Sequence, residues 1–245
     1  MNRISLSDCG RQRSNNEDAY ANRGYDSFEL SVIADGMGGH LAGEVASKMA
    51  TEAVLAYFDR EQKRTDYPRM AGEAVEEANR LLYEKQSKDP TVSGMGTTAD
   101  VVVVEGSTLH LAHVGDSRVY LLRDACLRQV TADHSLVGDL IRRGLLTEQD
   151  AKSHPDRSVV TRALGAAPQV EVDLLSIPLR DKDRILLCTD GLSNMVDDEE
   201  IRSVLVEFES LALCAEQLVA RANGHGGADN ITLTIFEYRS EEWNK

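Results

Sequence analysis

The chain has 245 residues, 42% of them hydrophobic, which is enough to bury one large core. Its 41 acidic side chains against 27 basic ones give a net charge of −14, which disfavours nucleic acid as a partner because an acidic surface repels a polyanion. No run approaches the ~18 apolar residues of a membrane-spanning helix, and the first ten residues lack the apolar stretch of a signal peptide. The four cysteines show no C-x-x-C spacing, so neither a zinc site nor a disulfide framework is indicated. We expect a cytoplasmic protein that contacts no membrane, folded as one domain over residues 1–245.

The predicted elements, in chain order, are consecutive strands interrupted by a few long helices. Apolar runs predict strands at 3–9 and 28–34, and i, i+4 apolar spacing predicts helices at 41–58 and 69–86. Residues 97–131 read as several strands joined by turns at Glu105-Gly106 and Arg123-Asp124. Strands at 170–176, 184–189 and 230–238 follow, with helices at 197–206 and 210–223. Asp197 with Glu200 resembles a capping box. Because the strands do not alternate with helices, antiparallel sheets covered by helices fit better than a doubly wound sheet.

Several carboxylates recur where predicted strands end or begin. Asp35 follows one strand as "ADG", Asp190 follows another as "TDG", and Asp116 follows "AHVG". Asp229 precedes the last strand, and "RSNNED" places Glu17 and Asp18 just after the first. A single aspartate in such a place is often only a turn former. The repetition favours a shared site, because crowded carboxylates repel one another unless a cation lies between them. Oxygen ligands of this kind select Mg²⁺ or Mn²⁺ over zinc or copper.

Two phosphate-binding motifs are excluded near Asp35. A G-x-G-x-x-G pattern starting at Gly36 would need glycine where the chain has Leu41, and no G-x-x-x-x-G-K-[ST] sequence occurs. Glycine after aspartate instead lets the backbone approach an ion, so the Gly36 carbonyl is itself a candidate ligand.

The motifs together resemble a known family. "GRQRSNNEDAY", "ADGMGGHLAGE", "GMGTT", "AHVGDSRVY", "TADHSLVGDLIRRG", "VVTRALG", "LLCTDGLSN" and "GGADNITL" occur in this order. They resemble the metal-dependent protein Ser/Thr phosphatases of the protein phosphatase 2C type, in their compact bacterial form, over about residues 4–238. The resemblance implies an α+β fold, a four-layer αββα sandwich of two antiparallel β-sheets flanked by helices, with the metal centre at one end.

The resemblance also implies a role for each matching residue. Asp35 would bridge two Mn²⁺ or Mg²⁺ ions, with the Gly36 carbonyl on one ion and Asp190 and Asp229 on the other. Glu17 and Asp18 would act directly or through water, and Asp116, with Asp190, would hold a weaker third ion. Arg13 would grip the substrate phosphate, for which its planar donor fork is suited. Asn230 would orient Asp229.

The implied reaction is direct hydrolysis of phosphoserine or phosphothreonine by a hydroxide that bridges the metals. Many family members carry histidine directly after "DG", where this chain has Met37. His40 is the nearest candidate for the general acid; the alternatives are that it only caps the following helix or that a metal-bound water donates the proton. The expected partners are phosphorylated proteins and a cognate Ser/Thr kinase, and the chain is expected to be a monomer.

Residues 131–165 form a segment with five acids and five bases in an otherwise acidic chain. Asp133 as an N-cap and Thr147 with Asp150 as a capping pair predict short helices. The resemblance places a flap here, beside the metal centre. Its arginines, Arg142, Arg143, Arg157 and Arg162, are candidates for contacts with the substrate protein. A solvated surface excursion is the alternative.

Two other functions are weighed against phosphatase activity. A phosphoprotein-binding module with an inactive centre is disfavoured because Arg13, Asp35, Asp190 and Asp229 are all present. A two-metal nuclease is disfavoured by the acidic composition and the lack of a basic groove.

Overall fold

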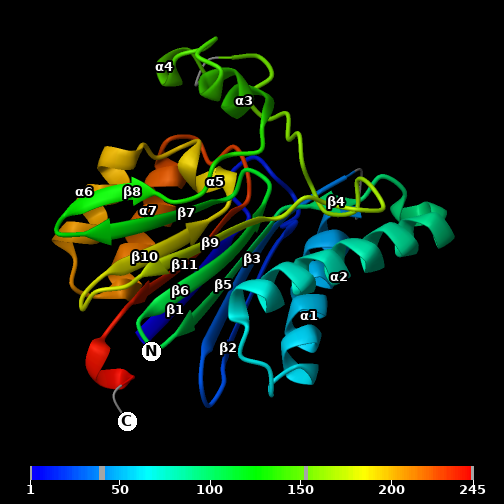
Figure 1. The fold of residues 1–245 in the computed structure, drawn as a ribbon. Coiled ribbons are helices and arrows are strands. Elements are labelled where there is room, and N and C mark those ends of the chain that lie inside the picture. Colours follow the sequence, from blue (N-terminus) through cyan, green and yellow to red (C-terminus); the bar gives the residue numbers. More distant parts are fainter. Residues whose placement is uncertain (1, 39–41, 152–153, 244–245) are drawn as a thin grey trace.

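Two antiparallel β-sheets pack face to face with helices on both outer faces in the computed structural model, which describes residues 2–38, 42–151 and 154–243 (Figure 1). The strands are β1 (Asn2–Asp8), β2 (Asp18–Gly24), β3 (Glu29–Met37), β4 (Gly96–Thr97), β5 (Ala99–Glu105), β6 (Thr108–Val114), β7 (Arg118–Arg123), β8 (Cys126–Gln129), β9 (Asp173–Pro178), β10 (Arg184–Cys188) and β11 (Ile231–Glu237). The helices are α1 (Ala42–Arg60), α2 (Tyr67–Lys88), α3 (Leu136–Arg142), α4 (Glu148–Ala151), α5 (Asp190–Ser193), α6 (Asp198–Glu207) and α7 (Leu211–Gly224).

The strand order confirms the predicted four-layer α+β sandwich. One sheet has the order β1-β11-β10-β7-β8 and packs against α5, α6 and α7. The other has the order β2-β3-β5-β6-β9, with β4 paired to the end of β3, and packs against α1 and α2. All of the strand pairs are antiparallel, as consecutive strands with short connections require. Among the described residues, no helix combines the length and apolarity that crossing a membrane requires.

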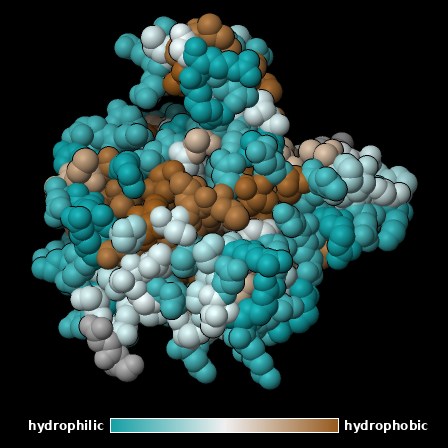
Figure 2. Space-filling view, in the orientation of Figure 1, coloured by the Kyte–Doolittle hydropathy of each residue, from teal (hydrophilic) through white to brown (hydrophobic). Residues whose placement is uncertain are grey.

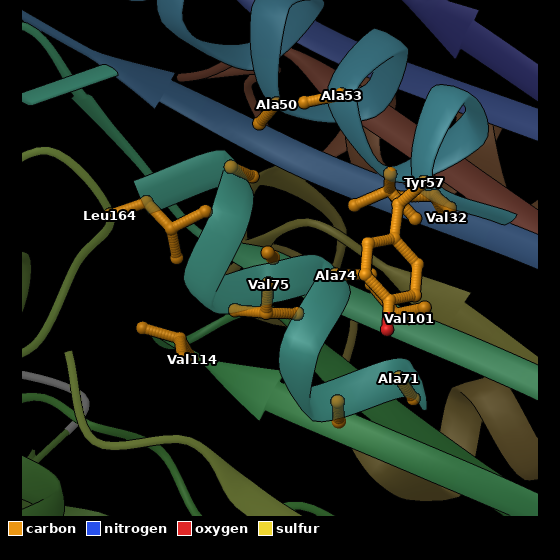
Figure 3. Close-up of a cluster of buried hydrophobic side chains, with 14 of the residues drawn as sticks. Val32, Ala50, Ala53, Tyr57, Ala71, Ala74, Val75, Val101, Val114 and Leu164 are labelled. Carbon is orange, nitrogen blue, oxygen red and sulfur yellow. The ribbon is translucent and has the colours of Figure 1, made fainter. Parts of the chain in front are cut away.

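Small side chains let α1 and α2 lie close to each other and to their sheet. Ala50 and Ala53 of α1 and Ala74 of α2 are buried in one cluster with Val32 of β3 and Val101 of β5 (Figure 3). Burying such side chains is the main favourable term in folding, at about 25 cal/mol per Å² of apolar surface. The rigid layer that results carries the end of β3 on which Asp35 lies.

The space between the two sheets has an apolar half and a polar half. Ile33, Leu187 and Phe236 belong to the apolar cluster shared by both sheets. Towards β1 and β2 the interior is polar, with hydroxyl pairs Ser5–Thr234 and Ser7–Thr232, each with 2.7 Å between the oxygens. Each of these four hydroxyls therefore has a hydrogen-bond partner, as buried polar groups require.

Three local predictions differ from the structure or are extended by it. Strand β2 was not predicted, and β3 continues past Asp35 to Met37 because Gly36 and Met37 pair with β4. The prediction that Asp133 caps a helix is wrong. Ser135 caps α3, accepting a hydrogen bond from Gly138 N at 3.1 Å, and the carboxylate of Asp133 binds the guanidinium of Arg118 at 2.7 Å.

Two other predicted helix starts are confirmed. Asp197 accepts from Glu200 N at 2.9 Å at the start of α6, and Thr147 Oγ1 accepts from Asp150 N at 3.2 Å at the start of α4.

The segment 131–165, which we call the flap segment, carries α3 and α4 and projects beyond one end of the sandwich (Figure 1). Its last part returns to the body, where Leu164 pairs with Thr97 of β4. Below the flap segment, Figure 2 shows a hydrophobic band crossing a largely hydrophilic face. Strand β9, at the edge of its sheet, carries two exposed leucines, Leu174 and Leu175.

Candidate metal centre

Asp35 lies at the centre of a group of carboxylates at one end of the sandwich. Register places Asp18 of β2 directly opposite Asp35 of β3, so the two side chains share one face of the sheet. Burial raises the pKa of Asp35 well above its usual value, and the charges of neighbouring carboxylates, Asp18 and Asp190 foremost, raise it further. The structure therefore brings Asp190 close to Asp18 and Asp35, although these residues lie far apart along the chain.

Asp18 is held by hydroxyl groups from the other sheet. Thr189 Oγ1 donates to Asp18 Oδ2 at 2.9 Å, while Asp18 Oδ1 is buried without a hydrogen-bond partner among the described residues. Burial raises the pKa of Asp18 to about 7, against the opposing effect of hydrogen bonds from Thr232 and Thr189. A buried carboxylate oxygen without a donor is costly to a fold, so it indicates that a positive ligand belongs there.

Asp190 begins the short helix α5 directly after β10. Its Oδ2 accepts from Asn194 Nδ2 at 3.0 Å, and burial followed by the charge of Asp229 raises its pKa to about 6. Asp116, 8% exposed, follows β6 and faces the same group; burial followed by the charge of Asp190 raises its pKa to about 8.

Asp229 has a cationic partner in this structure. Arg13 Nη2 donates to Asp229 Oδ2 at 2.8 Å, and both side chains are substantially exposed, at 52% and 36%. Arg13 therefore lies beside the carboxylates, as the phosphate-binding role requires. Its guanidinium and the Asp229 carboxylate neutralise each other.

Asn230 acts on the loop that carries Glu17 and on Asp229 in different ways. Its side-chain Oδ1 accepts from Glu17 N at 2.8 Å, and its Nδ2 donates to Asn15 O at 2.8 Å. Its backbone N–H, not its side chain, donates to Asp229 Oδ1 at 2.9 Å. The side chain thus fastens the Glu17 loop to the start of β11.

The glycines after Asp35 and Asp190 have a packing reason. A Cβ on Gly36 would lie 2.1 Å from Gly43 O and 2.4 Å from Glu17 O, and one on Gly191 would lie 1.9 Å from Asn230 O. Only glycine allows these backbone approaches, which bring α1 and the Glu17 loop onto β3 and α5 onto β11. The ligand role of the Gly36 carbonyl stays a prediction.

The donor set suits a hard divalent cation, although the side chains are not preset as a chelate. Among the described residues, no group of three or more His, Cys, Asp or Glu side chains is already arranged to hold a metal ion. The carboxylates are instead crowded, with raised pKa values at Asp18, Asp35, Asp116 and Asp190. The residues fit Mg²⁺ or Mn²⁺ by charge and ligand type.

The candidate residues of the flap segment lie in two different environments. Arg143 and Arg157 are exposed, and Arg142 pairs with Asp139 and donates to Asp133 O at 2.8 Å. Arg162 lies where the segment rejoins the body, 2.6 Å from Asp173 Oδ1. His40, the candidate acid, lies outside the described residues.

Two hydroxyl residues near the centre were not singled out from the sequence. Thr98 Oγ1 accepts from Asp35 N at 2.9 Å and is 2.8 Å from Ser117 Oγ, so it joins the loops of Asp35 and Asp116. The motifs "GMGTT" and "GDSR" contain these residues, but nothing in either motif indicates that the two meet.

Comparisons with known proteins point to a single family. A family model described as protein phosphatase 2C matches residues 8–225. The chain is 39% identical over 242 residues to the serine/threonine phosphatase stp of Listeria monocytogenes serotype 4b, covering 94% of this chain and 93% of that protein. The crystal structure of the Mycobacterium tuberculosis serine/threonine phosphatase PstP/Ppp is similar with a TM-score of 0.88 and 39% identity, over 97% and 98% of the two chains. A structure of the PstP catalytic domain in complex with two manganese ions is similar with a TM-score of 0.84 and 37% identity, over 96% of each chain.

Proposed function

Because the chain belongs to the protein phosphatase 2C family of metal-dependent serine/threonine protein phosphatases, we propose that the carboxylates around Asp35 are its catalytic centre. The protein is a phosphoprotein phosphatase, and its substrates are phosphorylated proteins. The observation that carries the proposed centre is the crowding of four buried or half-buried carboxylates whose pKa values are all raised. A folded protein keeps such a group where a cation neutralises it.

The proposed division of roles is the one that the family resemblance implies. Asp35, central in the group, would contribute to both ions, the Gly36 carbonyl would be a further ligand of one ion, and Asp190 and Asp229 would be ligands of the other. Glu17 and Asp18 would contribute directly or through water. Asp116, with Asp190, would hold a third and weaker ion.

Two divalent cations, Mn²⁺ or Mg²⁺, supply a nucleophile from water near neutral pH and neutralise phosphoryl oxygens when bound. Arg13 contributes to the same neutralisation from the protein. When Asp229 serves as a ligand, the Arg13 guanidinium is free to donate two parallel hydrogen bonds to the substrate phosphate. The side chain of Asn230 keeps the loop between Arg13 and Glu17 against β11, and so fixes the distance of that guanidinium from the carboxylates.

We further propose that residues 1–245 act as one catalytic domain and as a monomer, and that a cognate Ser/Thr kinase supplies the phosphoproteins. The four cysteines are free in the structure, which fits a reducing compartment such as the cytoplasm. The flap segment, beside the centre, is proposed to contact the protein around the phosphate.

An assay of the purified protein with Mn²⁺ on a phosphothreonine peptide, a small aryl phosphate and DNA tests the function. We expect hydrolysis of both phosphate monoesters and none of DNA, complete loss in EDTA, and recovery with excess Mn²⁺. Full activity in the chelator would refute the metal centre, and cleavage of DNA would restore the nuclease alternative.

A further inference from the structure

His134, at the start of the flap segment, is bonded twice to the residue that precedes Asp116. Its backbone N–H donates to Gly115 O at 2.7 Å, and its ring Nδ1 lies 3.0 Å from Gly115 N. A backbone N–H can only donate, so Nδ1 is the acceptor, and a neutral ring then carries its proton on Nε2. Nε2 has two neighbours, Asp173 Oδ2 on β9 at 3.2 Å and Arg162 Nη1 at 3.0 Å; a guanidinium can only donate, so the carboxylate is the acceptor for the ring proton.

The surroundings of the ring keep it in this form. His134 is 4% exposed, and burial, followed by the charges of His113 and Arg162, lowers its pKa to about 4. The ring is therefore neutral at pH 7, and its Nδ1 lone pair stays available to Gly115. Arg162 binds the other oxygen of Asp173 at 2.6 Å, which fixes the carboxylate that orients the imidazole.

Gly115 needs such an external contact because its own conformation is not restricted by a side chain. Its φ of +120° is one that glycine adopts readily, and a Cβ there would lie 2.5 Å from Thr98 Cβ. On the far side of Asp116, Ser117 is held by the hydroxyl of Thr98 at 2.8 Å. Asp116 thus lies between two anchored residues, with His134 as the anchor on the flap side.

We propose that His134 is a positioning residue for Asp116: it accepts the Gly115 N–H and thereby fixes the loop that presents the carboxylate, with Asp173 and Arg162 holding the imidazole in place. The consequence for metal binding rests on the role of Asp116 proposed above. The contact also ties the root of the flap segment to the metal centre.

Two substitutions distinguish the contact made by Nδ1 of the ring from the contact made by Nε2. His134→Asn places an amide oxygen where Nδ1 lies and keeps an acceptor for Gly115, whereas His134→Gln places its amide near Nε2 and keeps only the contact with Asp173. His110→Gln is the matched control, because His110 is also buried and joins β6 to β9, through Ser176 at 2.8 Å, away from Gly115. The measurement is hydrogen exchange of the Gly115 amide by NMR in metal-free protein.

We expect exchange at Gly115 to be about tenfold faster in His134→Gln, the scale of one lost hydrogen bond, and close to wild type in His134→Asn and His110→Gln. Calorimetry with Mn²⁺ should then show the weakest binding step reduced about tenfold in His134→Gln, the scale of a lost outer contact at a metal site, with the tight steps retained. In turnover, kcat should fall while KM changes little.

Equal Gly115 exchange in the Asn and Gln variants would overturn the proposal. The exchange measurement needs no metal, so it is independent of the proposed function. If the wild-type protein showed no weak Mn²⁺ binding step, the proposed metal role of Asp116 would be wrong. The role of His134 would then be decided by Gly115 amide exchange in the Asn and Gln variants alone.

Discussion

The same chemical group has opposite pKa shifts in two regions of the molecule. On α2 a surface carboxylate has a lowered pKa, whereas at the end of the sandwich the carboxylates have raised pKa values. Glu73 on α2 receives hydrogen bonds from Arg64, Tyr57 and Arg69, and Arg64 contributes most to lowering its pKa to about 2. Burial instead raises the pKa of Asp18 to about 7 and that of Asp116 to about 8. The surface groups are neutralised by arginines, whereas the group at the sandwich end has Arg13 on its exposed side as an ion-pair partner of Asp229.

The difference shows which carboxylates are neutral or favourable for the stability of the fold and which of them destabilise it. Exposed ion pairs add little stability, and removing one changes little. Buried carboxylates that repel one another destabilise the protein, so their retention is explained by a ligand that neutralises them. Substitutions on the two sides should therefore differ in both activity and stability.

The largest effect is expected for Asp35→Asn, which removes the central charge of the buried group with little change in shape. Turnover of a phosphothreonine peptide at saturating Mn²⁺ should fall at least about 10²-fold, the scale of losing one preorganised electrostatic contact in an active site. Asp190→Asn and Asp229→Asn should behave alike. Initial rates measure this, and activity within twofold of wild type would show that Asp35 is not a ligand.

Arg13→Ala should follow, because Arg13 belongs to the centre without being a ligand. We expect kcat/KM to fall about 10- to 100-fold on phosphopeptide and aryl phosphate alike, the scale of a charge-assisted hydrogen bond. Mn²⁺ affinity should be retained or rise, because Asp229 loses its competing partner. Calorimetry checks this; a loss of Mn²⁺ binding in the variant would make Arg13 structural.

The third effect concerns stability and has the opposite sign to the first. In metal-free protein at neutral pH, Asp35→Asn should raise the free energy of unfolding by about 0.5–2 kcal/mol, because it removes repulsion from an active site that is destabilised by its function. Mn²⁺ should stabilise the wild type more than the variant. Thermal unfolding with EDTA and with Mn²⁺ measures both, and a destabilised metal-free variant would contradict the crowding argument.

How far the sequence predicts these features depends on whether the cause is local. The layers were predicted because consecutive apolar strands and amphipathic helices follow from local periodicity. Strand β2 was not predicted, because "DAYANRG" faces the polar half of the interior, where Asn22 donates to Ser5 Oγ at 2.8 Å. Its alternating apolar positions hold only Ala19 and Ala21, a signal too weak to predict a strand.

The same distinction holds at the centre. Aspartates beside strands pointed to a site, but which groups bind one another depends on contacts between distant residues. Asp133 caps no helix because Arg118, 15 residues earlier, binds its carboxylate. His134 resembles any histidine in a polar segment until Gly115 and Asp173 are seen on either side of its ring.

A smaller effect is expected for the arginines of the flap segment, which were predicted from the sequence to contact the substrate protein. Their positions in the structure show which of them are free to do so. Neutralising the exposed Arg143 and Arg157 together should lower kcat/KM on phosphopeptides a few-fold, as expected when long-range charge steering is weakened, and leave an aryl phosphate unaffected. Arg162→Ala should affect both substrates, since Arg162 binds Asp173 at the root of the segment. Equal losses on both substrates for the exposed pair would show that the segment supports the centre and does not select substrates.

The smallest effect is expected for Glu73→Gln, which removes one negative charge just as Asp35→Asn does. Glu73 is 29% exposed and its partners, Arg64 and Arg69, stay solvated when it is neutralised, so the loss of stability should be below about 1 kcal/mol. Turnover and the response to Mn²⁺ should match the wild type, because the charge lies on a helix surface and not at the end of the sandwich. Thermal unfolding and initial rates, measured beside Asp35→Asn, check both points. A loss of turnover comparable to that of Asp35→Asn would mean that total acidity, and not the buried group, sustains activity.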